Sequence, residues 1–212
     1  MTAPQLPNAG ARPMASRRPP FDSVTIGFHW ATVLIVLAMF ATGWLHSRVH
    51  DDVFRAILLQ THRSLGVTIW VTTVSRLVWR LTSAKLPPFP RIMSKLHRAI
   101  VQASEYCLYA LLLLQPATGL AATLFARRPF ALFFWRIPQL LPENSALTAK
   151  FFLAHQLGAC VLGAMIVGHA AAALIHHFVL RDDVLHCMAP VITTEQQHGK
   201  YFSGGVIRSQ HS

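Results

Sequence analysis

Two histidines, His155 and His169, lie fourteen residues apart in one apolar segment that runs from Phe151 to about Leu180. Because an α-helix turns once in about 3.6 residues, this spacing places both imidazoles on one face. With a rise of about 1.5 Å per residue, they are separated by roughly 21 Å along the helix axis. A hydrocarbon core is about 30 Å thick, so we expect one histidine near each side of a membrane.

Histidine inside a membrane segment is energetically costly, which favours a functional role over packing alone. Neutral imidazole is an axial ligand of haem iron, so the pair could supply one ligand to each of two haems. The alternative is that both side chains hydrogen-bond to neighbouring helices.

The composition indicates an integral membrane protein. Of the 212 residues, 53% are hydrophobic and only 13% are charged, whereas soluble domains carry about 25% charged residues. The formal net charge of +11 does not indicate a nucleic-acid partner, because the basic residues cluster beside apolar runs, where they set topology and meet anionic lipid. The three cysteines form no C-x-x-C or C-x-x-C-H motif, so any haem must be held without thioether bonds.

Four apolar segments are long enough to span a membrane, which predicts an all-α four-helix transmembrane bundle within residues 21–190. They cover roughly Val24–Leu45, Val53–Leu81, Ala99–Phe125 and Phe151–Leu180. The apolar piece Phe130–Trp135 is too short to span and is expected to lie along the surface. Residues 1–20 are predicted to be a disordered cytoplasmic arm, and residues 191–212 a cytoplasmic tail.

The basic residues predict the orientation of these segments. Twelve of them lie in the N-terminal arm, around the connection between the second and third segments, and in the C-terminal tail, against seven on the other side. Since cytoplasmic loops are enriched in lysine and arginine, both termini are expected in the cytoplasm.

This topology sorts four histidines into two levels. The first helix enters from the cytoplasm, while the second and fourth enter from the opposite side. His29 and His169 therefore form an inner pair, and His62 and His155 form an outer pair. Two bis-histidine haems stacked across a bilayer would need this arrangement.

Three further residues are candidates for contacts with a haem or a quinone. Arg76 follows His62 by fourteen residues, so it falls on the same helix face at the inner level, where its guanidinium could pair with haem propionates. Arg80, one turn further, could do the same or extend to the interface. His176 follows His169 by seven residues and could contact a propionate or a quinone, or be an ordinary interfacial histidine.

Several short motifs surround these residues: Phe28-His29-Trp30, Thr61-His62-Arg-Ser-Leu-Gly66, Arg76-Leu-Val-Trp-Arg80, Gln115-Pro116-Ala-Thr-Gly119, Ala154-His155-Gln-Leu-Gly158 and Gly168-His169-Ala-Ala-Ala-Ala-Leu-Ile-His176-His177. With them, residues 21–190 resemble the bacterial cytochrome b-561 family of four-helix dihaem cytochromes of the respiratory chain. Relatives can carry additional histidines in the third helix, where this chain has Gln102-Ala-Ser-Glu105-Tyr-Cys107. A scheme with ligands from the third helix is therefore not expected.

The resemblance implies two non-covalent b-type haems in the bacterial inner membrane. It implies axial iron ligands at His29, His62, His155 and His169. It also implies electron exchange with the ubiquinone pool and, in some members, oxidation of superoxide.

Iron with two imidazole ligands has no open position, so the expected chemistry is one-electron transfer by an oxidoreductase that has no catalytic side chain of its own. The expected partners are the lipid bilayer, a quinone, an electron donor that the sequence does not identify and, in one arrangement, a second copy of the chain as a homodimer.

Three alternative functions are compatible with an apolar helical chain. The first, a cytochrome b subunit that anchors a dehydrogenase or hydrogenase, differs from the expected function only in its partner. A helical anchor without a cofactor would not explain the two histidine levels. A histidine-lined metal transporter would need polar groups along a path at mid-membrane, and the segments offer little beyond Glu105.

Overall fold

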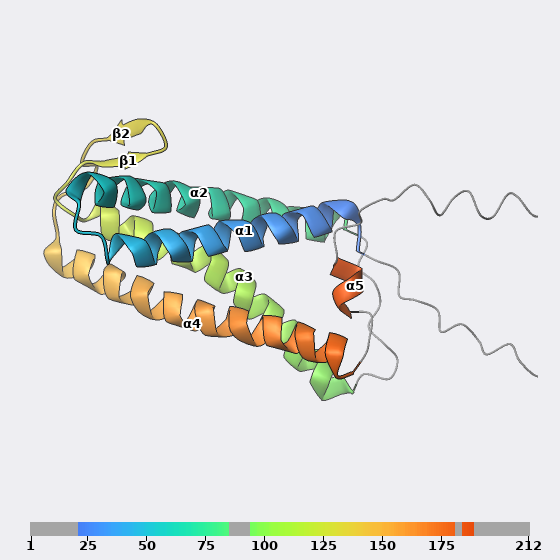
Figure 1. Cartoon of the computed structure of the whole chain (residues 1–212). Helices are drawn as coiled ribbons and strands as arrows, with labels where there is room; N and C mark the ends of the chain where they lie inside the picture. Colours follow the sequence, from blue (N-terminus) through green and yellow to red (C-terminus); the bar gives the residue numbers. More distant parts are fainter. Residues whose placement is uncertain (1–20, 85–93, 181–183, 189–212) are drawn as a thin grey trace, which may run out of the picture.

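Long apolar stretches with polar capping residues form four long helices, which run alternately in opposite directions (Figure 1). The computed structural model describes residues 21–84, 94–180 and 184–188. The helices are α1 (Ser23–His46), α2 (Asp52–Thr82), α3 (Lys95–Leu124) and α4 (Ser145–Phe178). Their N-terminal amides donate hydrogen bonds to the side chains of Asp22, Asp51, Ser94 and Asn144, the residue types that favour helix starts.

The four predicted helices are present, with shifted ends at two of them. α3 begins at Lys95 and α4 at Ser145, earlier than the apolar residues alone indicate, because Ser94 and Asn144 provide the caps. The predicted arm 1–20 and tail 191–212 lie outside the described residues.

Three of these helices are long and apolar enough to cross a membrane. They are α1, α3 and α4, with mean hydropathy of 2.0, 1.6 and 2.0 in their most apolar windows. In the described part of the chain, α2 does not reach this level, because His62, Arg63 and Arg76 interrupt its apolar residues.

The connection between α3 and α4 departs from the prediction of an all-α chain. It forms an antiparallel hairpin of β1 (Phe130–Leu132) and β2 (Trp135–Ile137) at one end of the bundle (Figure 1). Backbone atoms of Phe133, at the turn, bond to α2: its N–H donates to Ser64 Oγ over 2.7 Å and its C=O accepts from Gln60 Nε2 over 2.5 Å. The expectation of a surface segment is wrong for Phe130, which is only 7% exposed because it packs onto the bundle.

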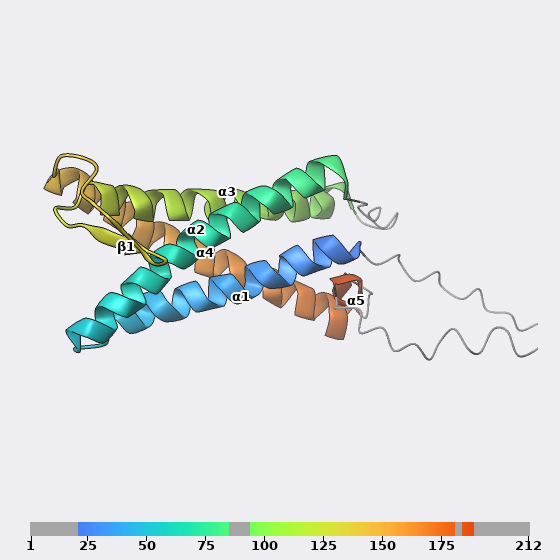
Figure 2. The same ribbon diagram turned by 90° about the horizontal axis from the view of Figure 1, so that it is seen from above.

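The opposite end of the bundle carries a short helix, α5 (Val184–Met188), beside the start of α1 and the end of α4 (Figure 1). The Phe21 N–H donates to the Cys187 carbonyl, and the Trp30 indole donates to the Met188 carbonyl. Seen from above, α1 and α2 meet at the loop that joins them and diverge toward this end (Figure 2).

A central apolar layer holds the four helices together. It consists of one buried residue from each helix: Val36, Ile69, Leu112 and Leu162. Leu162 lies seven residues from His155 and seven from His169. The layer therefore lies midway between the two histidines of α4.

Candidate functional site

The structure brings four histidines together in the two pairs that the topology predicts. In the outer pair, the ring centres of His62 and His155 are 6.1 Å apart and the rings are perpendicular, at 90°. In the inner pair, the ring centres of His29 and His169 are 6.4 Å apart, with 56° between the planes. Each pair joins α4 to α1 or α2.

α1 orients the ring of His62. Its Nδ1 lies 3.1 Å from the Met39 carbonyl oxygen and 3.3 Å from Thr42 Oγ1. An Nδ1–H donated to a carbonyl leaves the Nε2 lone pair available to a metal. The next residue, Gly43, makes room for the ring, because an added Cβ would lie 3.2 Å from His62 Cε1.

α3 orients the ring of His155 in the same way. Its Nδ1 lies 3.0 Å from the Gln115 carbonyl oxygen and 3.2 Å from Thr118 Oγ1. An added Cβ on Gly119 would lie 2.9 Å from His155 Cε1 and 3.1 Å from its Nδ1. α1 and α3 thus share one arrangement, a Thr-Gly dipeptide next to a histidine of the following helix. The threonine hydroxyl contacts the imidazole, and the glycine leaves room for the ring.

The role of these four residues was not predicted from the sequence, although Thr118 and Gly119 belong to the Gln115–Gly119 motif. The dipeptide Thr42-Gly43 lies in the first apolar segment, and Thr118-Gly119 lies in the third. Each precedes a segment that carries a histidine of the outer pair. The repeat of this dipeptide in alternate segments is the sequence signal for the supporting role.

Gly158, three residues after His155, lies against the side chain of Gln115 in α3. The Gln115 side-chain amide fills the space next to this glycine, closer than an added Cβ would allow. The amide donates to the His155 carbonyl over 2.9 Å, so this glycine serves the packing of α3 on α4.

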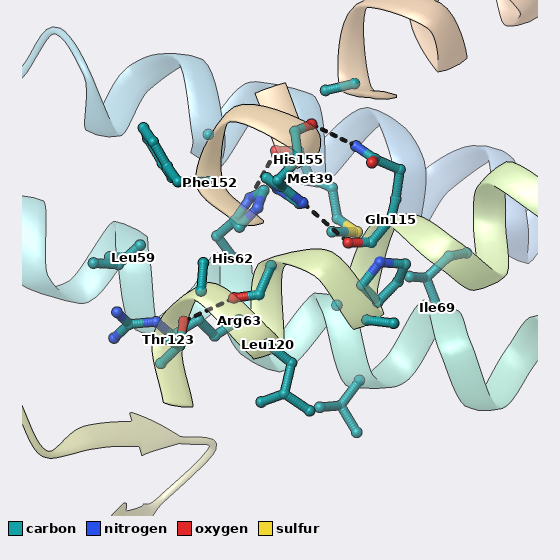
Figure 3. Close-up of a pocket in the computed structure, with 18 of the residues that line it drawn as sticks. Met39, Leu59, His62, Arg63, Ile69, Gln115, Leu120, Thr123, Phe152 and His155 are labelled. Carbon is teal, nitrogen blue, oxygen red and sulfur yellow. Dashed lines mark hydrogen bonds between the residues drawn. The ribbon is translucent and has the colours of Figure 1, made fainter. Parts of the chain in front are cut away.

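The outer pair lies in a cavity of about 840 Å³ between the helices at the hairpin end. Figure 3 shows His62 and His155 next to one another inside it, with Phe152, Ile69 and mostly apolar side chains around them. Pockets for small molecules and cofactors are mostly apolar and have volumes of about 300–1,000 Å³. The cavity therefore suits a large, mostly apolar group.

Helix packing leaves the same space open. Among the described residues, α4 packs its backbone closely on α3 and α5 but not on α1 or α2. Nevertheless, His155 and His169 of α4 face histidines on those two helices. On this face α4 therefore contacts α1 and α2 through side chains rather than through close backbone packing.

The predicted propionate ligands lie at the inner level in different surroundings. The Arg76 guanidinium carbon lies 5.3 Å from the centre of the Tyr109 ring, and its charge acts on both His29 and His169. Arg80 is engaged by Glu105 in a two-pronged ion pair, whose Nη2–Oε2 distance is 2.9 Å. Arg76 is therefore the better placed of the two arginines for a propionate.

His176, the candidate quinone contact, lies at the end of α4 next to a histidine of α3. The ring centres of His176 and His97 are 5.5 Å apart. His97 had no predicted role, because it lies in a different segment and only packing of α3 on α4 brings it here.

Known proteins match most of the chain. Residues 20–190 match the family described as prokaryotic cytochrome b561. The chain is 29% identical to "Cytochrome b561 homolog 2" of Escherichia coli K12 over 170 residues, covering 79% of this chain and 90% of the relative. It is 25% identical to "Cytochrome b561 homolog 1" of the same organism, covering 80% and 97%.

A third relative, of Yersinia pestis, is named "Probable superoxide oxidase CybB". It is 25% identical over 170 residues, covering 80% of this chain and 96% of the relative. The family match, the candidate membrane-spanning helices and the two pairs of neighbouring histidines all indicate a membrane cytochrome. The chain belongs to the prokaryotic cytochrome b561 family, haem-binding b-type cytochromes of membrane electron transport.

Proposed function

We propose that this protein is a dihaem cytochrome b that carries electrons between the two faces of the bacterial inner membrane and exchanges them with ubiquinone. The observation that carries the proposal is the separation of the paired rings, 6.1 Å in the outer pair and 6.4 Å in the inner pair. Imidazoles that bind one metal from opposite sides have ring centres about 6.2–6.4 Å apart, given a metal–nitrogen bond of 2.0–2.1 Å.

The donor set also fits haem. Two neutral imidazoles suit iron, and a bound b-type haem would supply reversible one-electron chemistry. The residues of the chain would position the haem and set its surroundings. The carbonyls of Met39 and Gln115 orient the outer rings, and the mostly apolar wall of the cavity would surround a bound haem.

We infer that α2 is the fourth membrane span. At 31 residues it is about 46 Å long, and it packs beside α1 and α3. His62 and Arg63 line the cavity between the helices. Large apolar side chains are exposed along the rest of the helix, at Ile57, Trp70, Val71, Val78 and Leu81. His62 and Arg63 thus face the inside of the bundle, and apolar side chains on the outer face of α2, such as Val71 and Val78, are available to lipid.

The basic residues support cytoplasmic termini, which would place the inner pair near the cytoplasm and the outer pair near the periplasm. The name of the Yersinia pestis relative favours superoxide as an electron donor. The neighbouring rings of His176 and His97 are a candidate contact for the quinone.

We expect the purified protein to contain two non-covalent b-type haems per chain, because each histidine pair provides both axial ligands of one iron. A pyridine haemochrome assay, set against protein concentration from amino-acid analysis, measures the ratio. Acid–acetone should extract all of the haem, since the chain has no C-x-x-C-H motif. A ratio near one, or haem that resists extraction, would contradict the proposal.

We expect Arg76→Leu to lower the midpoint potential of the inner haem or to speed its loss. The guanidinium lies close enough to act electrostatically on both inner histidines, and removing a positive charge favours the ferric form. A two-step redox titration checks this, with Arg55→Leu as control, because Arg55 is half-exposed and paired with Asp52. Two unchanged steps would assign Arg76 a structural role beside Tyr109.

A further inference from the structure

Two buried polar atoms of the described chain have no hydrogen-bond partner in the protein, and both belong to the same cavity. They are Nε of Arg63 and Oγ1 of Thr148, residues that line the space around His62 and His155. Buried donors without partners are rare and energetically costly, so each indicates a missing acceptor. Their location in one cavity suggests one ligand for both.

Both side chains lie toward the hairpin end of the outer pair. Thr148 precedes His155 by seven residues, which is about two turns and therefore the same face of α4. Arg63 directly follows His62, and helical side chains lean toward the N-terminus, which for α2 is the hairpin end (Figure 1). Consistent with this, its guanidinium carbon lies 5.7 Å from the ring centre of Phe130 in β1.

The arrangement indicates the chemistry of the ligand. A guanidinium and a hydroxyl both donate hydrogen bonds, and a guanidinium matches a carboxylate in shape and charge. The remaining wall is mostly apolar, and the two imidazoles stand at its centre. The missing group is thus apolar with anionic oxygens at the edge that faces the hairpin.

We propose that Arg63 and Thr148 bind the propionate carboxylates of the outer haem. This inference rests on the proposed function, because it takes the outer pair as the iron ligands. The proposal also assigns a different arginine to the haem at each level. The outer haem is held by an arginine beside its own axial ligand, whereas Arg76 serves the inner one. The competing source of anionic oxygens is the phosphate of a membrane lipid.

The chain offers a matched control for each substitution. Thr123 also lines it, but its hydroxyl already donates to the Gly119 carbonyl over 2.9 Å. Arg55 is on the same helix, half-exposed and ion-paired with Asp52. Thr123→Val and Arg55→Gln therefore remove a hydroxyl and a positive charge without removing the proposed contact.

The test measures the midpoint potential and the haem retention of the full-length protein in detergent. Arg63→Gln should lower the potential of the outer haem alone, because the ferrous form loses the stabilising positive charge. Transfer of the outer haem to apomyoglobin should become about 10-fold faster, as expected for a lost charge-assisted hydrogen bond. Thr148→Val should give a smaller change in the same direction, and Arg63→Lys should restore most of the potential.

Three results would overturn the inference. The first is an Arg63→Gln protein whose outer-haem potential and haem-transfer rate equal those of Arg55→Gln. The second is a Thr148→Val protein whose values equal those of Thr123→Val. The third is an Arg63→Gln protein that keeps both midpoint potentials but co-purifies with less phospholipid, measured as phosphorus, which would assign the site to a lipid phosphate. If the Arg63→Gln protein does not accumulate, the same measurements on Arg63→Lys and Thr148→Val test the inference. The haem content of the wild type, measured first, reports on the proposed function separately.

Discussion

His62→Ala and His155→Ala are expected to give the same phenotype, the loss or conversion to high spin of one haem component. Each substitution leaves a single imidazole at a site where the two rings now lie 6.1 Å apart. His29→Ala and His169→Ala should form a second matching set that affects the other component. A rigid helix holds His155 and His169 roughly 21 Å apart, so neither can replace the other.

Low-temperature absorption and EPR spectra of the four variants, recorded beside the wild type, provide the measurement. A double substitution within one pair should add little to either single one, because both residues act on one centre. A double substitution across pairs should remove both components. The pairing would be wrong if His29→Ala matched His155→Ala.

Gly119→Ala is expected to disrupt the outer haem site although both proposed ligands, His62 and His155, are retained. The new methyl group would lie 2.9 Å from His155 Cε1, closer than real Cβ atoms approach, so the ring must leave its position beside Thr118. Overpacking of this kind costs about 1–3 kcal/mol of stability. We expect a shifted or high-spin outer component, an unchanged inner one and a lower unfolding temperature.

Gly168→Ala provides the matched control for that substitution. Gly168 also adjoins a histidine, His169, yet a methyl group added there would meet nothing within 4 Å. The outer haem component of Gly168→Ala should match that of the wild type. A Gly119→Ala protein with wild-type spectra would show that the His155 ring tolerates displacement and that the close approach has no role in ligation.

The histidine pairs could be predicted from sequence because both depend on regular spacing. Fourteen residues on a helix fix the relation of His155 to His169, and alternating helix direction then selects His62 and His29 as their neighbours. Helix ends were less predictable, because Ser94 and Asn144 cap α3 and α4 ahead of the apolar residues.

Contacts between distant segments could not be predicted in this way. The ion pair between Arg80 and Glu105 joins α2 to α3, and the sequence of neither segment predicts which residue of the other it contacts. The same holds for the unpartnered atoms of Arg63 and Thr148, which become meaningful only when α2 and α4 are placed around one cavity. The hairpin was missed because its strands have three residues each and little apolar alternation.

The layer of Val36, Ile69, Leu112 and Leu162 has an electrical consequence. These four side chains are hydrocarbon, and a proton or a metal cation needs water or polar groups to pass, whereas an electron does not. On the proposed function, each electron that passes between the two histidine levels moves an uncompensated charge through the low-dielectric middle of the bundle. Moving one charge through 100 mV is worth about 2.3 kcal/mol. The membrane voltage would therefore drive electrons in one direction and oppose them in the other, which makes the protein a generator or a consumer of that voltage.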